Sequence, residues 1–326
     1  MSHTNYRLPA EWEHQSATLL AWPHDKTDWS GQLDAIRREY VALIDTILPH
    51  QKVVVLVSPG DRSAEKSLSG RARLHLVEAR FNDTWCRDYG PITLVSDGDR
   101  LALDFHFNGW GGKYPARLDN RVNTLLARHP LFDRLTFRQY LFELEGGAIE
   151  PDGQGALLVN WHCLHARHPH LTRGEIEHEL HNLLNIDHVV GIDLEPMSGD
   201  DTDGHIDTLA RFISPDIIVF QDQGDTSRTD RLRGQLESLR TADGQPFDLF
   251  VLPCPEDIDP TLPASYANFM YVNGACLVPA YGSDSDELAR GVLADLLPER
   301  AVRSVSARVM ISQFGGPHCA SMHIPA

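Results

Sequence analysis

The sequence has 326 residues, 42% of them hydrophobic, which is enough to build the core of one large domain or two ordinary ones. Its formal net charge of −17 argues against a nucleic-acid-binding surface, which needs clustered Lys and Arg, and suits a small cationic ligand, although simple solubility explains it equally well. The longest aliphatic run, residues 53–57, is too short for the ~20 residues that cross a bilayer, and no leader pattern opens the chain, so we expect a cytoplasmic protein with no membrane partner.

Helical and strand patterns alternate along the chain. Ser30 is expected to cap a helix that ends at Pro49, and Thr172 and Glu175 form a capping box that begins another helix. A short apolar strand follows each predicted helix. The helix and strand pairs, in chain order, are 33–47 with 53–57, 176–184 with 188–192, 231–239 with 249–252, and 287–297 with 302–309. Further strand-rich stretches are expected at 101–107, 156–161, 216–221 and 269–278.

The domain organisation is predicted from the absence of linkers and from the spacing of polar residues. No low-complexity or Gly/Ser segment divides the chain, so we predict a single catalytic domain, 1–326, of the α/β class. Asp88, Glu145 and His205 follow one another at nearly equal intervals, and Cys319 lies about two intervals further on. A radial array of such units brings one loop from each to a common axis, as in propeller-like folds. Chance spacing is the alternative, because the units show no visible self-similarity.

Two acidic motifs are candidates for holding a cation. Asp88 can take a planar guanidinium in a two-pronged pair, and Trp85 beside it can add a cation–π attraction of about 1 kcal/mol. The alternative is an ordinary strand-end turn in which Asp88 pairs with Arg87 or with a backbone amide. Glu145 precedes two glycines that permit close backbone approach, and it could orient His205 through a hydrogen bond.

A third motif, 199–207, is rich in Asp and contains His205 and Asp207, which would point to the same face of a strand. Calcium is disfavoured there, because the loop lacks the register of a calcium-binding loop. Cys319 lies in a glycine-containing loop; a thiolate is a competent nucleophile, and a neighbouring cation lowers the pKa of a thiol. A thiol, an imidazole and several carboxylates together indicate guanidine hydrolysis, whereas Cys319 alone would more often be inert.

The chain also contains a His-rich segment and five cysteines. Residues 162–170 are rich in His and include Cys163, but their spacing matches no standard zinc site, so we interpret them as a connecting loop and leave metal binding there open. The five cysteines form no CxxC pair, which argues against a disulfide framework. Cys86 lies next to the presumed pocket, where packing is favoured over oxidation sensing.

Taken together, these motifs resemble the agmatine deiminase and bacterial peptidylarginine-deiminase-like family of the guanidine-modifying, or pentein, superfamily. The resemblance implies a five-bladed α/β propeller of repeated strand-strand-helix-strand units around a pseudo-fivefold axis. It runs nearly from end to end and is carried by the segments 22–24, 82–91, 107–112, 144–147, 203–207, 264–269 and 315–319.

The resemblance also implies residue roles and a reaction. The implied catalytic residues are Cys319 as nucleophile, His205 as general acid and base, Asp88 and Asp207 as guanidinium clamps, and Glu145 as support for His205. The implied pocket residues are the walls Trp85, Trp110 and Trp22, and the close-approach residue Gly316. The implied activity is hydrolysis of agmatine to N-carbamoylputrescine and ammonia through a covalent Cys thiouronium, with no metal or organic cofactor.

The substrate is predicted from charge. Agmatine ends in an ammonium that Asp200, Asp201 or Asp203 could receive, whereas arginine would require a cationic residue for its carboxylate. The loop before Cys319 departs from the family's Gly-Gly-Gly-Asn-x-His-Cys. Thr208 and Glu150 stand where Asn and His are frequent. These departures leave the chemistry in place and bear on the choice of substrate. The alternatives are an arginine or peptidylarginine deiminase or an amidinotransferase and, in another class, a non-catalytic protein that binds cationic metabolites. The expected partner is a small cationic guanidine substrate, with no nucleic acid, and assembly into a homo-oligomer is left open.

Overall fold

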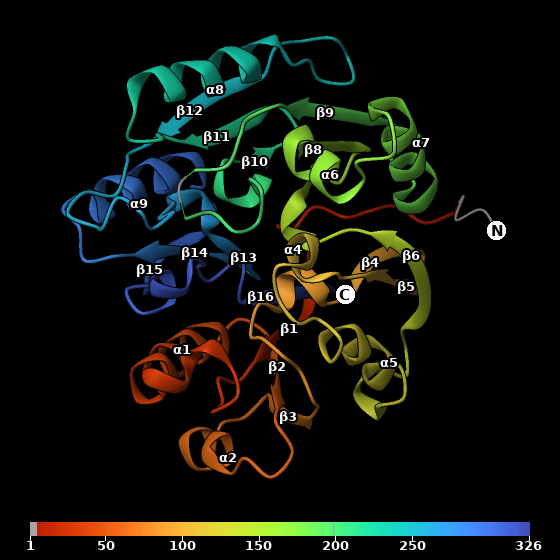
Figure 1. The fold of residues 1–326 in the computed structure, drawn as a ribbon, viewed down its shortest axis with the longest axis vertical. Coiled ribbons are helices and arrows are strands. Elements are labelled where there is room, and N and C mark those ends of the chain that lie inside the picture. Colours follow the sequence, from red (N-terminus) through yellow and green to blue (C-terminus); the bar gives the residue numbers. More distant parts are fainter. Residues whose placement is uncertain (1–4, 198) are drawn as a thin grey trace.

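The computed structural model describes residues 5–197 and 199–326, and its strands form five β-sheets (Figure 1). In every sheet one strand pair is antiparallel and the next is parallel. The first sheet contains β1 (Gln15–Ala21), β2 (Lys52–Val57), β3 (Leu74–Glu78) and β16 (Ser321–Pro325). The other four are β4 (Ile92–Ser96), β5 (Asp99–His106) and β6 (Thr136–Glu143); β7 (Ile149–Pro151), β8 (Ala156–Asn160) and β9 (His188–Ile192); β10 (Ala210–Ser214), β11 (Ile217–Gln221) and β12 (Asp248–Leu252); and β13 (Met270–Val272), β14 (Ala275–Ala280) and β15 (Ala301–Ser306).

Helical segments cross between the parallel strands of each sheet. The longer helices are α1 (Leu33–Ile47), α7 (Arg173–Leu184), α8 (Thr226–Ser238) and α9 (Ser285–Leu296), which lie at the periphery in Figure 1. The shorter ones are α2 (Ser63–Leu68), α3 (Cys86–Tyr89), α4 (Gly109–Gly112), α5 (Val122–Leu126) and α6 (Trp161–Arg167). Parallel strands need such crossovers, so each sheet repeats a strand, strand, helix, strand order. The last strand of the chain, β16, pairs with β1 and completes the first sheet.

The inner strands carry the core. β2, β8 and β14 are buried along nearly their whole length, as expected for strands covered on both faces, and their sequences are accordingly almost continuously apolar. The outer strands β12 and β15 expose most of their residues. Residues near the inner edges of the sheets are thus held rigidly, and the loops that leave those edges can present side chains at fixed positions.

Several expectations from the sequence are confirmed. The capping box of α7 is present, with Thr172 and Glu175 bonded reciprocally, and the predicted strand 188–192 coincides with β9. Helices and strands at the other predicted pairs are found within a few residues of their expected bounds. The described chain also contains no helix with the length and apolar character needed to span a membrane.

Three local expectations are wrong. Ser30 does not cap α1, because it lies in a preceding 3₁₀ turn, Asp28–Gly31. The His-rich segment is not a loop: Asn160 caps it by accepting from the His162 backbone N–H, and α6 results. His205 and Asp207 do not share a strand, because Ile206–Thr208 is a 3₁₀ turn.

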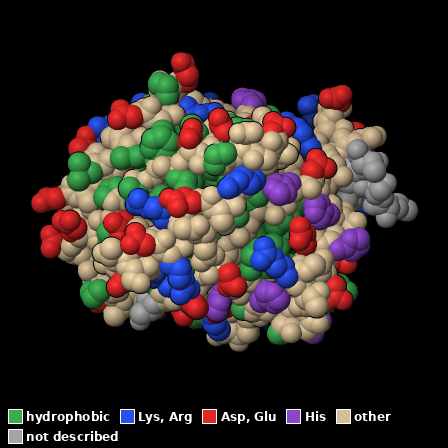
Figure 2. All heavy atoms as spheres, turned by 90° about the horizontal axis from the view of Figure 1, so that it is seen from above, with side chains coloured by type: hydrophobic (Ala, Val, Ile, Leu, Met, Phe, Trp, Pro, Cys, Tyr) green, Lys and Arg blue, Asp and Glu red, His purple; other side chains and the backbone are tan. Residues whose placement is uncertain are grey.

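The surface agrees with the composition. On the face shown in Figure 2, Lys and Arg side chains are interspersed with Asp and Glu instead of gathering into one basic area. This distribution fits the negative net charge and gives that face no footprint for a nucleic-acid backbone.

Candidate active site

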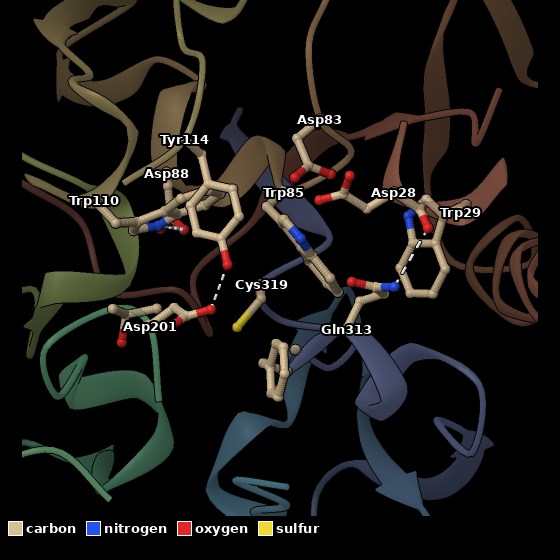
Figure 3. A pocket seen from close by; sticks show the side chains of 13 residues that line it. Asp28, Trp29, Asp83, Trp85, Asp88, Trp110, Tyr114, Asp201, Gln313 and Cys319 are labelled. Carbon is tan, nitrogen blue, oxygen red and sulfur yellow. Dashed lines mark hydrogen bonds between the residues drawn. The ribbon is translucent and has the colours of Figure 1, made fainter. Parts of the chain in front are cut away.

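A pocket of about 530 Å³, counting the space at its open mouth, lies where loops from several sheets meet (Figure 3). Three tryptophans, a tyrosine and several acids form its walls, and the Cys319 sulfur points into it. The thirteen lining residues are Asp28, Trp29, Asp83, Trp85, Asp88, Trp110, Tyr114, Asp201, Thr202, Gln313, Phe314, Gly315 and Cys319. Its mix of aromatic walls and convergent polar groups is that of a small-molecule site.

Cys319 is held between an amide and a carboxylate. Its sulfur lies 3.1 Å from the Asn268 Nδ2, which donates to it, and 3.6 Å from the Asp207 Oδ2. Burial and the negative charges of Asp207 and Asp88 raise the pKa of the Cys319 thiol well above its usual value. A cation beside the sulfur, the condition under which a lowered pKa was predicted, would be needed to favour the thiolate.

Asp207 is buried, with its two oxygens in different situations. Its Oδ2 accepts from His318 Nδ1 at 2.7 Å and from Asn268 Nδ2 at 3.1 Å. Burial raises the pKa of Asp207, but the bond from His318 and the positive charges of His318, His205 and Arg211 together outweigh burial and hold that pKa below its usual value. Its Oδ1 is buried and has no hydrogen-bond partner among the described residues. Asp207 therefore holds a charged carboxylate with one buried oxygen that no described residue engages.

Asp88 supplies a second buried carboxylate at the site. It lies on α3, where its Oδ1 accepts from the Gly147 backbone N–H at 3.1 Å and its Oδ2 accepts from the Trp110 indole at 3.0 Å. Trp110 reaches it from a left-handed backbone conformation, with a φ of 54° that is unusual for a large residue. Burial raises the pKa of Asp88 to about 6.

His205 lies directly behind Asp88. Its Nδ1 is 3.7 Å from the Asp88 Oδ1, and neither ring nitrogen has a hydrogen-bond partner among the described residues. Burial lowers the pKa of His205, but the negative charge of Asp88 and the nearby Cys163 sulfur outweigh burial and raise that pKa to about 10. Gly147 makes this approach possible, because a Cβ there would lie 2.5 Å from the His205 Nδ1. His205 is thus protonated at neutral pH and placed against Asp88.

Glu145 does not bond to His205 as expected. Its Oε1 instead accepts from Arg167 Nε at 2.5 Å, and its Oε2 has no partner among the described residues. Arg167 also bonds Asp203 at 2.6 Å. The reason is that α6, which was predicted to be a loop, carries a buried arginine that takes both acids. Glu145 still helps to raise the pKa of His205, but through its charge.

Glu145, Cys163 and His205 are also the group of described residues that could hold a metal ion, with ligand atoms within 4.8 Å of one another. Cys163 is the only member from the His-rich segment 162–170, so the expected candidate ligands there do not converge. The Arg167 guanidinium on Glu145 places a positive charge beside the position that an ion would take. The group therefore fits a metal poorly.

Aromatic and acidic residues shape the rest of the pocket. Trp29 and Trp85 pack at a tilt with ring centres 5.8 Å apart. Tyr114 donates to Asp201 at 2.5 Å. Figure 3 shows Asp201 on one side of Cys319.

Comparison with known proteins identifies the family. The model of the Porphyromonas-type peptidyl-arginine deiminase family matches residues 7–325. The chain belongs to this deiminase family.

Individual relatives agree with this placement. An agmatine deiminase of Pseudomonas aeruginosa (strain LESB58) is 29% identical, with 98% of this chain and 96% of the relative covered. A Cys-to-Ser variant of C. jejuni agmatine deiminase, solved with substrate bound, has a TM-score of 0.91 and 32% identity over 98% of this chain and 96% of that one. An Enterococcus faecalis agmatine deiminase structure, 24% identical, shares the fold with a TM-score of 0.89 over 98% of this chain and 96% of that one.

For this member of the deiminase family, Trp22 was predicted to be a pocket wall, and that expectation is wrong. Trp22 follows β1 into the core, is fully buried, and donates to Ser63 Oγ at 2.8 Å. Trp29 takes its place in the wall. No local signal in the sequence marks Trp29, because it is as fully buried as Trp22 and differs from it in lying in the turn Asp28–Gly31.

The expected amine-binding and backbone-contact residues also need correction in this deiminase. Asp203 is occupied by Lys113 and Arg167, and Asp200 lines a different hollow, so neither is a free acid of the pocket. Asp201, one residue along from Asp200, does line it. Gly315 rather than Gly316 lines the pocket, because Gly316 packs on Asn268.

Cys86 is fully buried, and its thiol donates to two backbone carbonyls, which favours packing. Burial raises the pKa of Cys86 to about 12. A thiol so protected is a poor candidate for an oxidation sensor.

Proposed function

We propose that this protein is an agmatine deiminase, an enzyme that hydrolyses agmatine to N-carbamoylputrescine and ammonia. The observation that carries the proposal is the placement of the Cys319 sulfur 3.6 Å from the Asp207 carboxylate, in one pocket with Asp88. A flat guanidinium between the two carboxylates would have its central carbon presented to sulfur. Positioning of this kind can supply several kcal/mol of the barrier reduction.

In the first half of the reaction, the guanidinium brings a positive charge next to Cys319. That charge offsets Asp207 and Asp88, so the thiol releases its proton to solvent and the thiolate adds to the central carbon. His205, protonated at neutral pH, donates a proton to the departing nitrogen. Ammonia leaves, and a thiouronium remains on Cys319.

In the second half, water enters in place of ammonia. His205, now neutral, takes a proton from the water as the oxygen bonds to the central carbon. The carbon–sulfur bond then breaks, the ureido product leaves, and Cys319 is restored. Asp88 and Asp207 keep the same hold throughout, and the sequence of steps uses no metal or organic cofactor.

The choice of agmatine over arginine follows from the lining charges. None of the thirteen described lining residues is Lys or Arg, so an α-carboxylate would enter an acidic pocket unpaired. Asp201 lies in the wall to receive the ammonium of agmatine. A peptidyl-arginine substrate is the second candidate, because the matching family model carries that description.

One experiment tests the proposed roles. Ammonia and ureido product are measured for agmatine, arginine and a blocked arginine peptide, with wild type beside Cys319→Ser and Asp207→Asn. Agmatine is expected to give the highest kcat/KM, and both variants are expected to lose turnover. A haloacetamidine should label wild-type Cys319 covalently, which would argue against a non-catalytic binding protein. Full activity in Cys319→Ser would overturn the mechanism.

The architecture is part of the proposal. We infer that the five sheets are five blades of an α/β propeller within a single catalytic domain, 1–326, because each sheet repeats the same order and β16 completes the first sheet. A cytoplasmic location and the state of oligomerisation stay predictions, to be measured by cell fractionation and by light scattering.

A further inference from the structure

A group of buried charged side chains adjoins Asp207 but does not line the pocket. Its centre is Glu11, in the segment before β1, which is 3% exposed. The reaction proposed above uses none of its members. They are Glu11, Arg87, Glu150, Arg211 and His318, all of them buried.

His318 is held between two carboxylates. Its Nδ1 lies 2.7 Å from the Asp207 Oδ2, and its Nε2 lies 2.6 Å from the Glu11 Oε2. An ionised carboxylate only accepts hydrogen bonds, and a neutral imidazole has one N–H to donate. Two such contacts at these lengths therefore require both ring nitrogens to carry protons, which makes His318 a buried imidazolium.

Glu11 is itself fixed from several sides. Its Oε1 accepts from the Tyr271 backbone N–H at 2.8 Å, and its Oε2 lies 3.3 Å from Arg87 Nη2 and 3.4 Å from Arg211 Nη2. Burial raises the pKa of Glu11, but the positive charges of His318, Arg87 and Arg211 hold that pKa well below its usual value. Glu11 thus stays ionised and cannot turn away from His318.

The charges of the group and Asp207 together balance only in this state, because burial lowers the pKa of the adjoining His323 to about 3 and leaves it neutral. Arg211 also pairs with Glu150 at 2.7 Å. The three acids Glu11, Glu150 and Asp207 are then matched by Arg87, Arg211 and His318, provided that His318 is charged. Buried charges persist when they are paired, so the network favours the imidazolium.

We propose that Glu11 is a positioning residue: it keeps His318 charged and aimed at the Asp207 Oδ2, which leaves the Asp207 Oδ1 ionised and free for the guanidinium. Glu11 does not line the pocket and acts through two intervening contacts. The kinetic consequence rests on the proposed deiminase function, whereas the charge of His318 does not.

The variant Glu11→Gln tests the charge with little change of shape. Because Oε1 accepts from the Tyr271 N–H, the new amide would place its NH₂ toward His318. The His318 Nε2 would then accept from the amide, and only the Nδ1 proton would remain. ¹⁵N spectra of ¹⁵N-histidine-labelled protein at pH 8 should show two protonated nitrogens for His318 in wild type and one in Glu11→Gln, with His318→Gln used to assign the signal.

The kinetic arm uses agmatine as substrate. Loss of one charge-assisted contact behind Asp207 should lower kcat/KM about 10- to 100-fold in Glu11→Gln, mainly through a higher KM. Glu11→Asp keeps the charge and should recover part of the loss. Glu13→Gln is the matched control, because Glu13 pairs with Arg7 at the surface, and it should stay within twofold of wild type.

The outcomes separate the two proposals. A neutral His318 in wild type at pH 8, or a folded Glu11→Gln with kcat/KM within twofold of wild type, would overturn the positioning role. If Glu11→Gln fails to fold, the wild-type spectrum alone decides. A wild type that turns over no guanidine refutes the proposed function, and the His318 spectrum then still tests the charged state.

Discussion

Gly147 offers a direct test of how closely the site is packed. A Cβ added there would lie 2.5 Å from the His205 Nδ1 and 3.0 Å from the Asp88 Oδ1, while ordinary van der Waals contact begins at 3.4 Å. Both neighbours are fully buried, so neither can swing into solvent. In Gly147→Ala, His205 or Asp88 must therefore move by about 1 Å, a displacement that can cost about 10²-fold in rate.

The assay is steady-state ammonia release from agmatine, together with a urea unfolding curve for each protein. Gly291→Ala is the matched control, because Gly291 lies inside α9 and a Cβ there meets nothing within 4 Å. That control should keep full activity and gain about 0.5 to 1 kcal/mol in stability from the better helix former. Gly147→Ala should lose about 10²-fold in kcat/KM while remaining folded.

The result that would refute this reasoning is a folded Gly147→Ala protein whose kcat/KM stays within threefold of wild type. It would mean that His205 or Asp88 can shift by about 1 Å without loss of rate. Catalysis that depends on the exact positions of these residues does not allow such a shift.

Three further outcomes are expected. Asp201→Asn should raise the KM for agmatine about tenfold with a smaller effect on kcat, because it removes the charge proposed to hold the ammonium; an unchanged KM would place that ammonium elsewhere. The kcat/KM should fall below about pH 6, where Asp88 takes up a proton and loses its charge. It should also fall above about pH 10, where His205 loses the proton it donates. A kcat/KM that does not change with pH would contradict both assignments. Arg167→Met should lower the urea unfolding free energy by about 3 to 5 kcal/mol, since Glu145 is left buried without its cation, and Arg62→Met, at an exposed pair, should cost under about 1 kcal/mol.

The sequence predicted best where a local rule decides the outcome. The capping box at Thr172 works through residues three positions apart, and it was recognised directly. Ser30 failed, because a 3₁₀ turn competed for the same residues and no side-chain bond favoured the cap. The His-rich segment failed in a related way: the cap that turns it into α6 is Asn160, which looked like the end of a strand.

The site shows the same division. Cys319, His205, Asp88 and Asp207 were picked out as candidates from their types and motifs. The structure places Cys319 and Asp88 in the pocket lining, Asp207 at 3.6 Å from the Cys319 sulfur, and His205 at 3.7 Å from Asp88. The partners of Glu145 and Asp203 could not be predicted from the sequence, because Arg167 lies far from Asp203 along the chain and meets it only through folding. The same holds for His318, whose second carboxylate, Glu11, comes from the opposite end of the chain.

By itself, the sequence determined which chemical groups this protein carries, the order of its helices and strands, and the class of reaction they suit. Tertiary structure alone decided which of several like residues faces the pocket: Trp29 instead of Trp22, and Asp201 instead of Asp203. The physical reason is competition for partners. Trp22 is taken by the core and by Ser63, and Asp203 is taken by Lys113 and Arg167, and those competitors come from distant parts of the chain.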